Sequence, residues 1–185
     1  MGERVVRNDE VGGSSPPIST TLISPLSHLR STRRKSGGGT DLWVQFEVGS
    51  AGWLERLAEI ATDCVREAPT GDPAKPFALS ERYTDAPSHI RNRGTDFEIT
   101  IQFSEAGAEV RPGFDSAADM TVIADYQAIL PLACYVVGIH EGGLAAFQAM
   151  LETLVMNGEA QLSGESPAYL APLHDRIASR SRPNP

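Results

Sequence analysis

The stretch Asn157-Gly158-Glu159-Ala160-Gln161-Leu162-Ser163-Gly164-Glu165 decides the fold that this sequence predicts. Asparagine followed by glycine is typical of a helix end, because both residues adopt the left-handed conformation readily. Residues 159–163 are long enough for a short strand, and Gly164 permits a turn directly after it. The stretch therefore predicts a helix, a short strand and a second helix in succession.

The segments on either side of this stretch have strong apolar periodicity. Residues 144–155 predict a helix with a broad apolar face. Ser166 followed by Pro167 predicts the start of the last helix, since serine caps helices and proline fits their first position. No nucleophile, metal cluster or phosphate loop accompanies these helices, so the pattern favours a module that encloses apolar volume over an enzyme.

Strands are predicted upstream by alternation of apolar and polar residues. Residues 97–103 alternate in this way, and residues 108–110 form a partner strand after a turn at Ala106-Gly107. Residues 118–125 alternate again and predict a third strand. We expect the three strands to form an antiparallel meander with one solvent-exposed face.

The first half of the folded region is less regular. Residues 42–48 alternate and predict a short strand, and Ser50 is a suitable N-cap for the helix that follows. That helix, residues 53–65, has clear amphipathic spacing and ends before Pro69. Residues 69–95 are rich in Pro, Gly, Asp and Ser, so we expect a loop or flap, with a short hidden strand as the alternative.

Composition indicates one domain and a tail. Residues 1–40 hold six Lys/Arg against three Asp/Glu and few apolar side chains, so they predict a disordered basic tail rich in Ser, Gly and Pro. The folded domain is expected over residues 41–180, with a frayed C-terminus over residues 181–185. The net charge of −8 argues against nucleic acid as a partner. No apolar run is long enough to cross a membrane.

The two cysteines, Cys64 and Cys134, lie within apolar helical patterns. Buried free thiols are the expected state of such residues, and neither has a basic neighbour in sequence that would lower its thiol pKa. Reduced thiols and the lack of a secretory signal predict a cytoplasmic protein.

The motifs around these elements resemble the sterol carrier protein 2 (SCP2) family of lipid-binding domains. The resemblance covers about residues 50–180. Its main motif runs from Ala146-Phe147 to Leu173, as a helix, a glycine, a short strand, a glycine with an acid, and a final helix. The strand Ala118–Val122, the hairpin Phe97–Arg111 before it and the opening helix Trp53–Leu57 also match the family pattern. The chain departs from the family at Glu159-Ala160-Gln161, where the family strand is usually basic.

The resemblance implies an α/β (α+β) fold with a five-stranded, mostly antiparallel sheet covered by helices. It also implies a hydrophobic tunnel between sheet and helices, with the last helix as a lid. The implied function is non-catalytic binding or transfer of a lipid, sterol or fatty-acyl ligand. The candidate tunnel lining is Phe147, Met150, Leu151, Leu154, Met156, Leu170, Leu173 and Ile177.

Two alternatives remain open for these apolar residues. They could simply fill a closed core, or an exposed face of the same helices could bind a partner enzyme or a second copy of the chain. In the second case the protein is an interaction or assembly module. A lipid that copurifies favours the carrier, and an empty stable dimer favours the module.

Signals for catalysis are weak, and no cofactor or metal is expected. His140-Glu141 begins like a zinc-protease motif, but Leu144 stands where the second histidine is required. Asp119 and Asp125 lie six residues apart, and a strand edge and a helix cap explain them better than acid–base chemistry.

An enzyme that uses the irregular segment 69–95 is the third hypothesis. Its candidate groups are Tyr83, Asp85 and His89. Loops often carry catalytic residues, which keeps this hypothesis open. The sequence otherwise predicts no catalytic residue.

Overall fold

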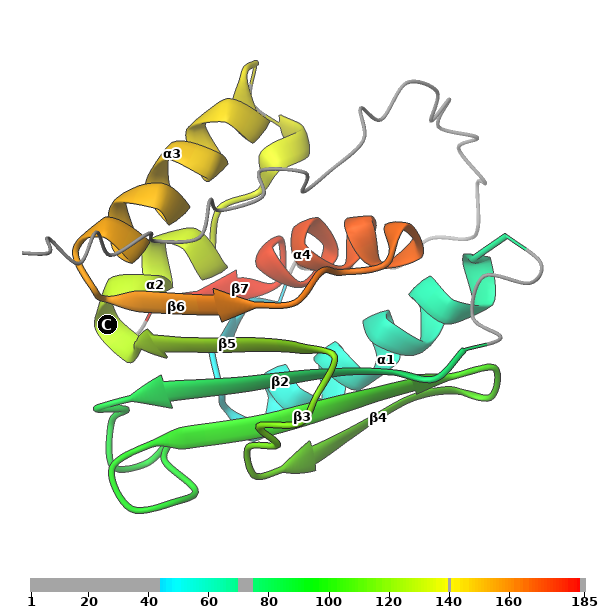
Figure 1. Cartoon of the computed structure of the whole chain (residues 1–185), viewed down its shortest axis with the longest axis horizontal. Coiled ribbons are helices and arrows are strands. Elements are labelled where there is room, and N and C mark those ends of the chain that lie inside the picture. Colours follow the sequence, from blue (N-terminus) through cyan, green and yellow to red (C-terminus); the bar gives the residue numbers. More distant parts are fainter. Residues whose placement is uncertain (1–43, 70–74, 140, 184–185) are drawn as a thin grey trace, which may run out of the picture.

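The computed structural model describes residues 44–69, 75–139 and 141–183, and the predicted tail of residues 1–40 lies outside them. Five strands form one sheet in the order β4-β3-β2-β5-β6 (Figure 1). Three of its four strand pairings are antiparallel, and β2 and β5 are parallel. The predicted α/β class with a five-stranded, mostly antiparallel sheet is therefore confirmed. The strands are β2 (Phe77–Thr84), β3 (Phe97–Ser104), β4 (Gly107–Pro112), β5 (Met120–Asp125) and β6 (Ala160–Ser163).

The predicted three-stranded meander is wrong in its strand order. The hairpin of β3 and β4 forms as the sequence predicts, but β5 pairs with neither of them. The central strand β2 lies between β3 and β5. It falls within residues 69–95, where the sequence predicts a loop or flap, with a short hidden strand as the alternative, and the structure shows the strand. Glu81 explains the error, because it replaces an apolar residue in the alternation of Phe77, Leu79 and Tyr83.

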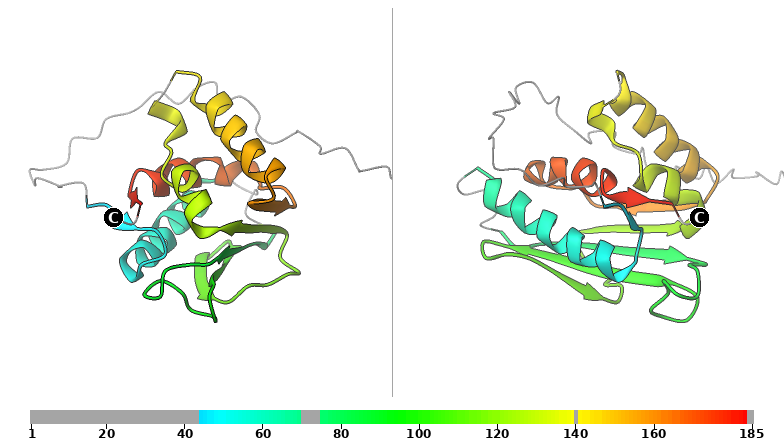
Figure 2. Two further views of the ribbon diagram at one scale, coloured as in Figure 1. Left: turned by 90° about the vertical axis from the view of Figure 1, so that its left-hand side faces the viewer. Right: turned by 180° about the vertical axis from the view of Figure 1, so that it is seen from behind.

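Helices cover one side of the sheet. The first, α1 (Ala51–Glu67), begins at the predicted N-cap Ser50, whose Oγ accepts a hydrogen bond from the backbone N–H of Trp53 at 3.3 Å. It lies beside α4 (Ala171–Ala178) on the same side of the strands (Figure 2). The predicted last helix begins later than Ser166, since a 3₁₀ turn, η3 (Ala168–Leu170), precedes α4.

Two further helices join β5 to β6. The short α2 (Tyr126–Ala133) contains Pro131, and Asp125 caps its start by accepting from the backbone N–H of Ala128 at 2.8 Å. A 3₁₀ turn, η2 (Val137–Ile139), then leads to α3 (Gly143–Met156). Figure 1 shows α3 beside the edge strand β6, away from α1.

The C-terminal residues differ from the predicted frayed end. Ser181–Arg182 form β7, which pairs in parallel with β1 (Phe46–Glu47). The indole Nε1 of Trp53 donates to the hydroxyl oxygen of Ser181 at 2.9 Å, and that hydroxyl donates to the carbonyl oxygen of Ile177 at 2.8 Å. These buried hydrogen bonds fix residues 181 and 182 against α1 and α4.

Candidate functional site

The helices cover their side of the sheet unevenly. On β3, Ile99 and Ile101 face the helices and are each 1% exposed. The neighbouring strands present two cross-strand rows on this side that remain only half-buried. We call these five residues the half-buried strip: Leu79 and Met120 in one row, and Glu81, Val122 and Leu162 in the other.

Strand alternation explains why these residues share a face. Side chains two positions apart on a strand point to the same side, and directly paired residues lie on the same face. Glu81 pairs with Ile99 on one side and with Val122 on the other, so its row continues the buried face of β3. The next row along the strands is buried and closes the strip at one end: Tyr83, Ala124 and Ala160.

The helix α3 carries the second half-buried apolar surface. Apolar residues occupy almost every face of this helix, yet Gly143 is its only buried residue. Such helices are normally enclosed in a core, so the incomplete burial of α3 is unusual. It packs on α2, η2 and β6, and its partly covered side chains against the core are Phe147, Met150, Leu151, Leu154 and Val155.

Contacts from α4 hold the connection that leads into α3. Asp175 accepts two hydrogen bonds, from the backbone N–H of Val137 at 2.8 Å and of Gly138 at 2.9 Å. The ring of His174 stacks edge-on against Phe147, with centroids 4.6 Å apart, and its Nε2 bonds the Tyr135 carbonyl oxygen at 2.9 Å. Burial lowers the pKa of His174, which favours a neutral ring in which Nε2 donates.

The eight residues predicted as tunnel lining fall into three groups. Phe147, Met150, Leu151 and Leu154 lie together, half-buried, on α3. Leu170, Leu173 and Ile177 are buried in η3 and α4, which pack against α1. Met156 is 79% exposed, so the structure does not bring it together with the others. Sequence reasoning missed the half-buried strip, although the alternation of Phe77, Leu79 and Tyr83 was a usable signal.

Glu81 is the charged member of the strip. The hydroxyl of Tyr83 donates to its Oε2 at 2.9 Å. Burial raises the pKa of the Glu81 carboxyl, and this hydrogen bond lowers it by a smaller amount. Burial, followed by the neighbouring charge of Glu81, raises the pKa of Tyr83 well above its usual range. Burial therefore makes a charge on Glu81 costly on this otherwise apolar surface unless it has a partner.

We expect Glu81 to make the stability of the protein depend on pH. Above the ordinary carboxyl pKa of 4.5, the folded state keeps a proton that the unfolded state has lost. The free energy of unfolding should therefore fall as pH rises from about 4.5 towards the folded pKa. Urea denaturation across this range should show a smaller fall for Glu81→Gln, which cannot titrate, whereas Glu109→Gln on exposed β4 should keep the wild-type slope. Equal slopes for wild type and Glu81→Gln would contradict the assignment.

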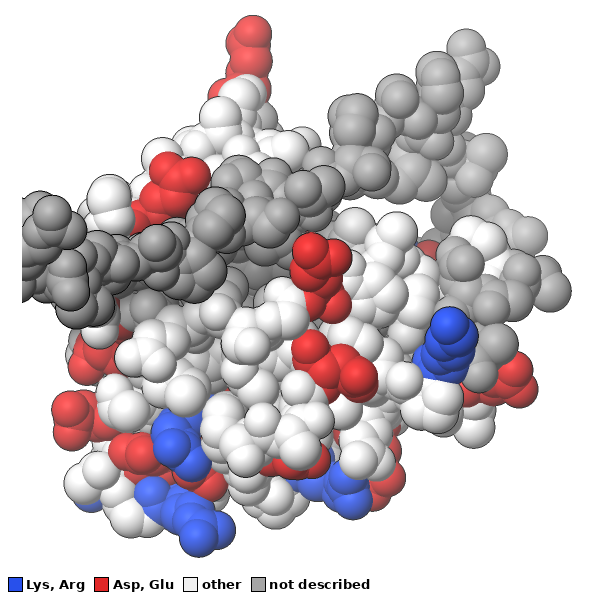
Figure 3. Space-filling view, viewed as in Figure 1, with Lys and Arg blue, Asp and Glu red and all other residues white. Residues whose placement is uncertain are grey.

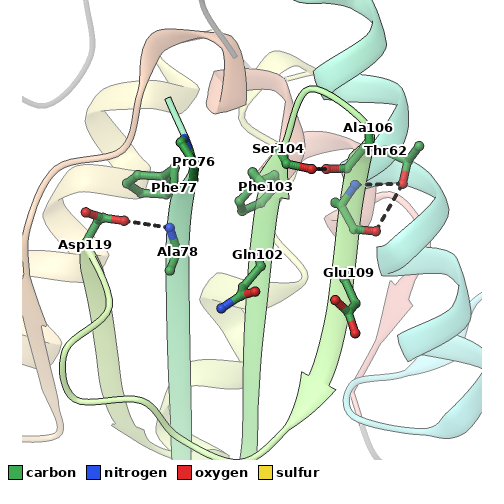
Figure 4. A pocket seen from close by; sticks show the side chains of 12 residues that line it. Thr62, Pro76, Phe77, Ala78, Gln102, Phe103, Ser104, Ala106, Glu109 and Asp119 are labelled. Atoms are coloured by element: carbon green, nitrogen blue, oxygen red, sulfur yellow. Dashed lines mark hydrogen bonds between the residues drawn. The ribbon is translucent and has the colours of Figure 1, made fainter. Parts of the chain in front are cut away.

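A separate concavity of about 430 Å³ lies at the end of the sheet near the β3–β4 turn (Figure 4). The rings of Phe77 and Phe103 lie next to each other in it, with centroids 5.9 Å apart. Two of its polar side chains bond the protein backbone, and Gln102 and Glu109 line it as well. Thr62 Oγ1 accepts from the backbone N–H of Ala108, and Asp119 Oδ2 accepts from that of Ala78 at 2.8 Å. Thr62 and Asp119 therefore hold the backbone at the rim of the concavity.

The structure does not assemble the weaker catalytic candidates. Asp119 and Asp125 bond backbone groups at opposite ends of β5. Tyr83 is buried, whereas Asp85 and His89 are exposed, and His89 contacts Glu47 at 2.9 Å. His140 lies outside the described residues, and within those residues no group of three or more His, Cys, Asp or Glu could hold a metal ion.

The surroundings of both thiols disfavour their ionised form. Burial raises the pKa of both Cys64 and Cys134, which disfavours the nucleophilic thiolate.

Figure 3 shows acidic side chains spread over one face of the molecule, with few basic ones. In the described part of the chain, no helix is both long and apolar enough to cross a bilayer.

The five-stranded, mostly antiparallel sheet with helices packed on one side agrees with the architecture that the sequence resemblance implies. The chain is similar to a solved structure of sterol carrier protein 2, with 16% identity, a TM-score of 0.41 and coverage of 74% of this chain and 100% of that one. A conserved hypothetical protein from Thermus thermophilus has 15% identity and a TM-score of 0.41, with coverage of 76% and 95%.

A third solved structure, a UbiJ-SCP2 ubiquinone synthesis protein, is 17% identical with a TM-score of 0.37, and the match covers 65% of this chain and 87% of that one. No protein-family model matches the chain, and no curated protein matches it significantly. With identities below 20% and TM-scores below 0.5, these likenesses assign the chain neither a ligand nor a residue role.

Proposed function

We propose that the protein binds or transfers a hydrophobic small molecule of lipid, sterol or fatty-acyl type, without catalysis, in the cytoplasm. The ligand occupies an apolar tunnel between the sheet and the helices. The observation that carries the proposal is the half-buried strip, because apolar side chains on the helix side of β2, β5 and β6 remain partly uncovered. The half-buried residues of α3 supply further apolar surface at β6.

Burial of a ligand on these surfaces supplies the driving force. Each CH₂ group removed from water contributes about 0.8 kcal/mol, so an alkyl chain needs apolar lining and few polar contacts. Native mass spectrometry of the full chain after expression tests the proposal directly. A copurified hydrophobic molecule supports it, and an empty protein that takes up neither a fluorescent fatty acid nor a fluorescent fatty alcohol contradicts it.

The two methionines of α3 provide a matched test of where the ligand binds. Met150 is half-buried against the core, whereas Met156 is 79% exposed. We expect Met150→Ala to weaken binding of a fluorescent fatty acid several-fold, since it removes apolar contacts worth about 1–2 kcal/mol. Met156→Ala should leave the dissociation constant unchanged. Equal effects of both substitutions would place the ligand elsewhere.

An assembly module is the second candidate. Two large apolar side chains at the ends of the η2–α3 region are exposed, Ile139 at 72% and Met156 at 79%. A second copy of the chain or a partner enzyme that covered them would bury apolar surface. Native mass spectrometry separates the two functions, because an empty and stable dimer favours assembly and a loaded monomer favours the carrier.

A further inference from the structure

One side chain on the helix side of the sheet does not fit an apolar lining. Glu81 is the only carboxylate that the five strands present on this side, where the paired residues are apolar. Its row neighbours are Ile99 and Val122, and the row ends at Leu162 on β6. A charged residue in the middle of such a row is destabilising unless it has a partner.

Among the described residues, the protein supplies a hydrogen-bond partner for only one of the two carboxyl oxygens of Glu81. Oε2 accepts from the Tyr83 hydroxyl at 2.9 Å, whereas Oε1 has no hydrogen-bond partner among the described residues. None of the ion pairs in the described part of the chain includes Glu81. The Glu81 residue also keeps partial exposure to solvent.

The opposite face of the sheet shows how this protein treats a carboxylate that serves structure. Glu98 on β3 is 3% exposed, and its Oε1 pairs with Arg82 Nε at 2.8 Å. Its Oε2 accepts from the backbone N–H of Phe114 at 3.2 Å. Both oxygens of Glu98 are therefore occupied by the protein, in contrast to Oε1 of Glu81.

We propose that Glu81 is the polar anchor of the hydrophobic ligand and selects a head group that donates a hydrogen bond, a hydroxyl or an amine, over a carboxylate. This inference rests on the proposed function and specifies its ligand class. A donor head group supplies the missing partner of Oε1, and the apolar body of the ligand lies along Leu79, Val122 and Leu162. A ligand carboxylate would place a second acid beside Glu81 without a cation to neutralise either.

The substitution Glu81→Gln distinguishes an amine head group from a hydroxyl head group. An amine gains from the charge of an ionised Glu81, and hydrogen bonds that involve a charged group are about twice as strong as neutral ones. A hydroxyl needs only an acceptor, which the glutamine amide oxygen also provides. Glu81→Leu removes the acceptor altogether and retains an apolar side chain of similar size.

The experiment measures dissociation constants of the full chain for three probes with one alkyl chain, which are n-dodecanol, n-dodecylamine and dodecanoate. We expect the wild-type protein to bind one of the donor probes at least about tenfold more tightly than dodecanoate. Glu81→Leu should abolish this preference. Glu81→Gln should abolish it if the favoured head group is the amine and preserve it if the favoured head group is the hydroxyl.

Other outcomes overturn the inference. Equal binding of the three probes, or a preference for dodecanoate, overturns the role of Glu81 and leaves the carrier function in place. A donor preference that persists in Glu81→Leu does the same. Binding of none of the probes overturns the proposed function, and the inference falls with it.

A control variant distinguishes head-group selection by Glu81 from a general effect of removing a carboxylate. Glu109→Gln removes an exposed carboxylate on β4 and should leave the order of the three probes unchanged. If Glu81→Leu does not fold, the near-isosteric Glu81→Gln still decides the amine case, and Glu81→Met, which lacks a strong acceptor, decides the hydroxyl case.

Discussion

Replacement of Gly164 by alanine is expected to destabilise the protein by about 3 kcal/mol or more. Gly164 has a φ of +84°, where a residue with a Cβ atom is strained by about 1–2 kcal/mol. A Cβ atom at this position would also lie 2.0 Å from the carbonyl oxygen of Asp119 and 2.9 Å from the Cα of Met120. Both contacts are with backbone at the start of β5, so the end of β6 would have to move away from its partner strand.

Gly158 provides the matched control for this prediction. It has a φ of +74°, and a Cβ atom there would meet nothing within 4 Å. Gly158→Ala should therefore show only the conformational cost, about 1–2 kcal/mol. Urea denaturation of both variants measures the difference. Equal losses of unfolding free energy would show that the contact with Asp119 is relieved without disturbance of the sheet.

The sequence predicts most elements whose pattern is local. The cap at Ser50 and the spacing from Trp53 to Val65 predict α1, and alternation predicts the β3–β4 hairpin. The glycines at 158 and 164 predict β6 between two helices, because positive φ is required at both positions. These signals depend on neighbours along the chain, which a sequence displays directly.

The sequence predicts the central strand β2 only as the alternative to a loop. Alternation fails at Glu81, and the strand lies in a segment with many loop-forming residues. Its position between β3 and β5 depends on pairing across the sheet, which local pattern does not encode. A break of a local rule is expected at functional positions, and here it falls on the one carboxylate of the half-buried strip.

Apolar spacing alone also could not show that α3 and α4 differ in burial. Both helices have an apolar face in sequence, so residues of both were predicted to line a tunnel. In the structure α4 packs on α1 and is buried, whereas α3 lies beside the edge strand β6 and keeps its apolar side chains partly exposed. The difference arises from which neighbour each helix finds, and this is a property of the tertiary structure.

The contrast between these helices gives the second large expected effect. Leu173 of α4 is 8% exposed, so Leu173→Ala should lower the free energy of unfolding by about 2–4 kcal/mol through the cavity it leaves. Leu151 of α3 is half-buried, so Leu151→Ala should cost only about 1 kcal/mol.

Ligand affinity should respond in the opposite order. Leu151→Ala removes apolar surface that the ligand would cover and should weaken binding of a fluorescent fatty acid about three- to tenfold. The folded fraction of Leu173→Ala should bind as the wild-type protein does, because that side chain is already covered by α1 and its neighbours. Denaturation and probe titration of the same samples separate the two effects. Lost affinity in Leu173→Ala with unchanged affinity in Leu151→Ala would place the ligand under α4 and give the last helix the lid role that the resemblance implies.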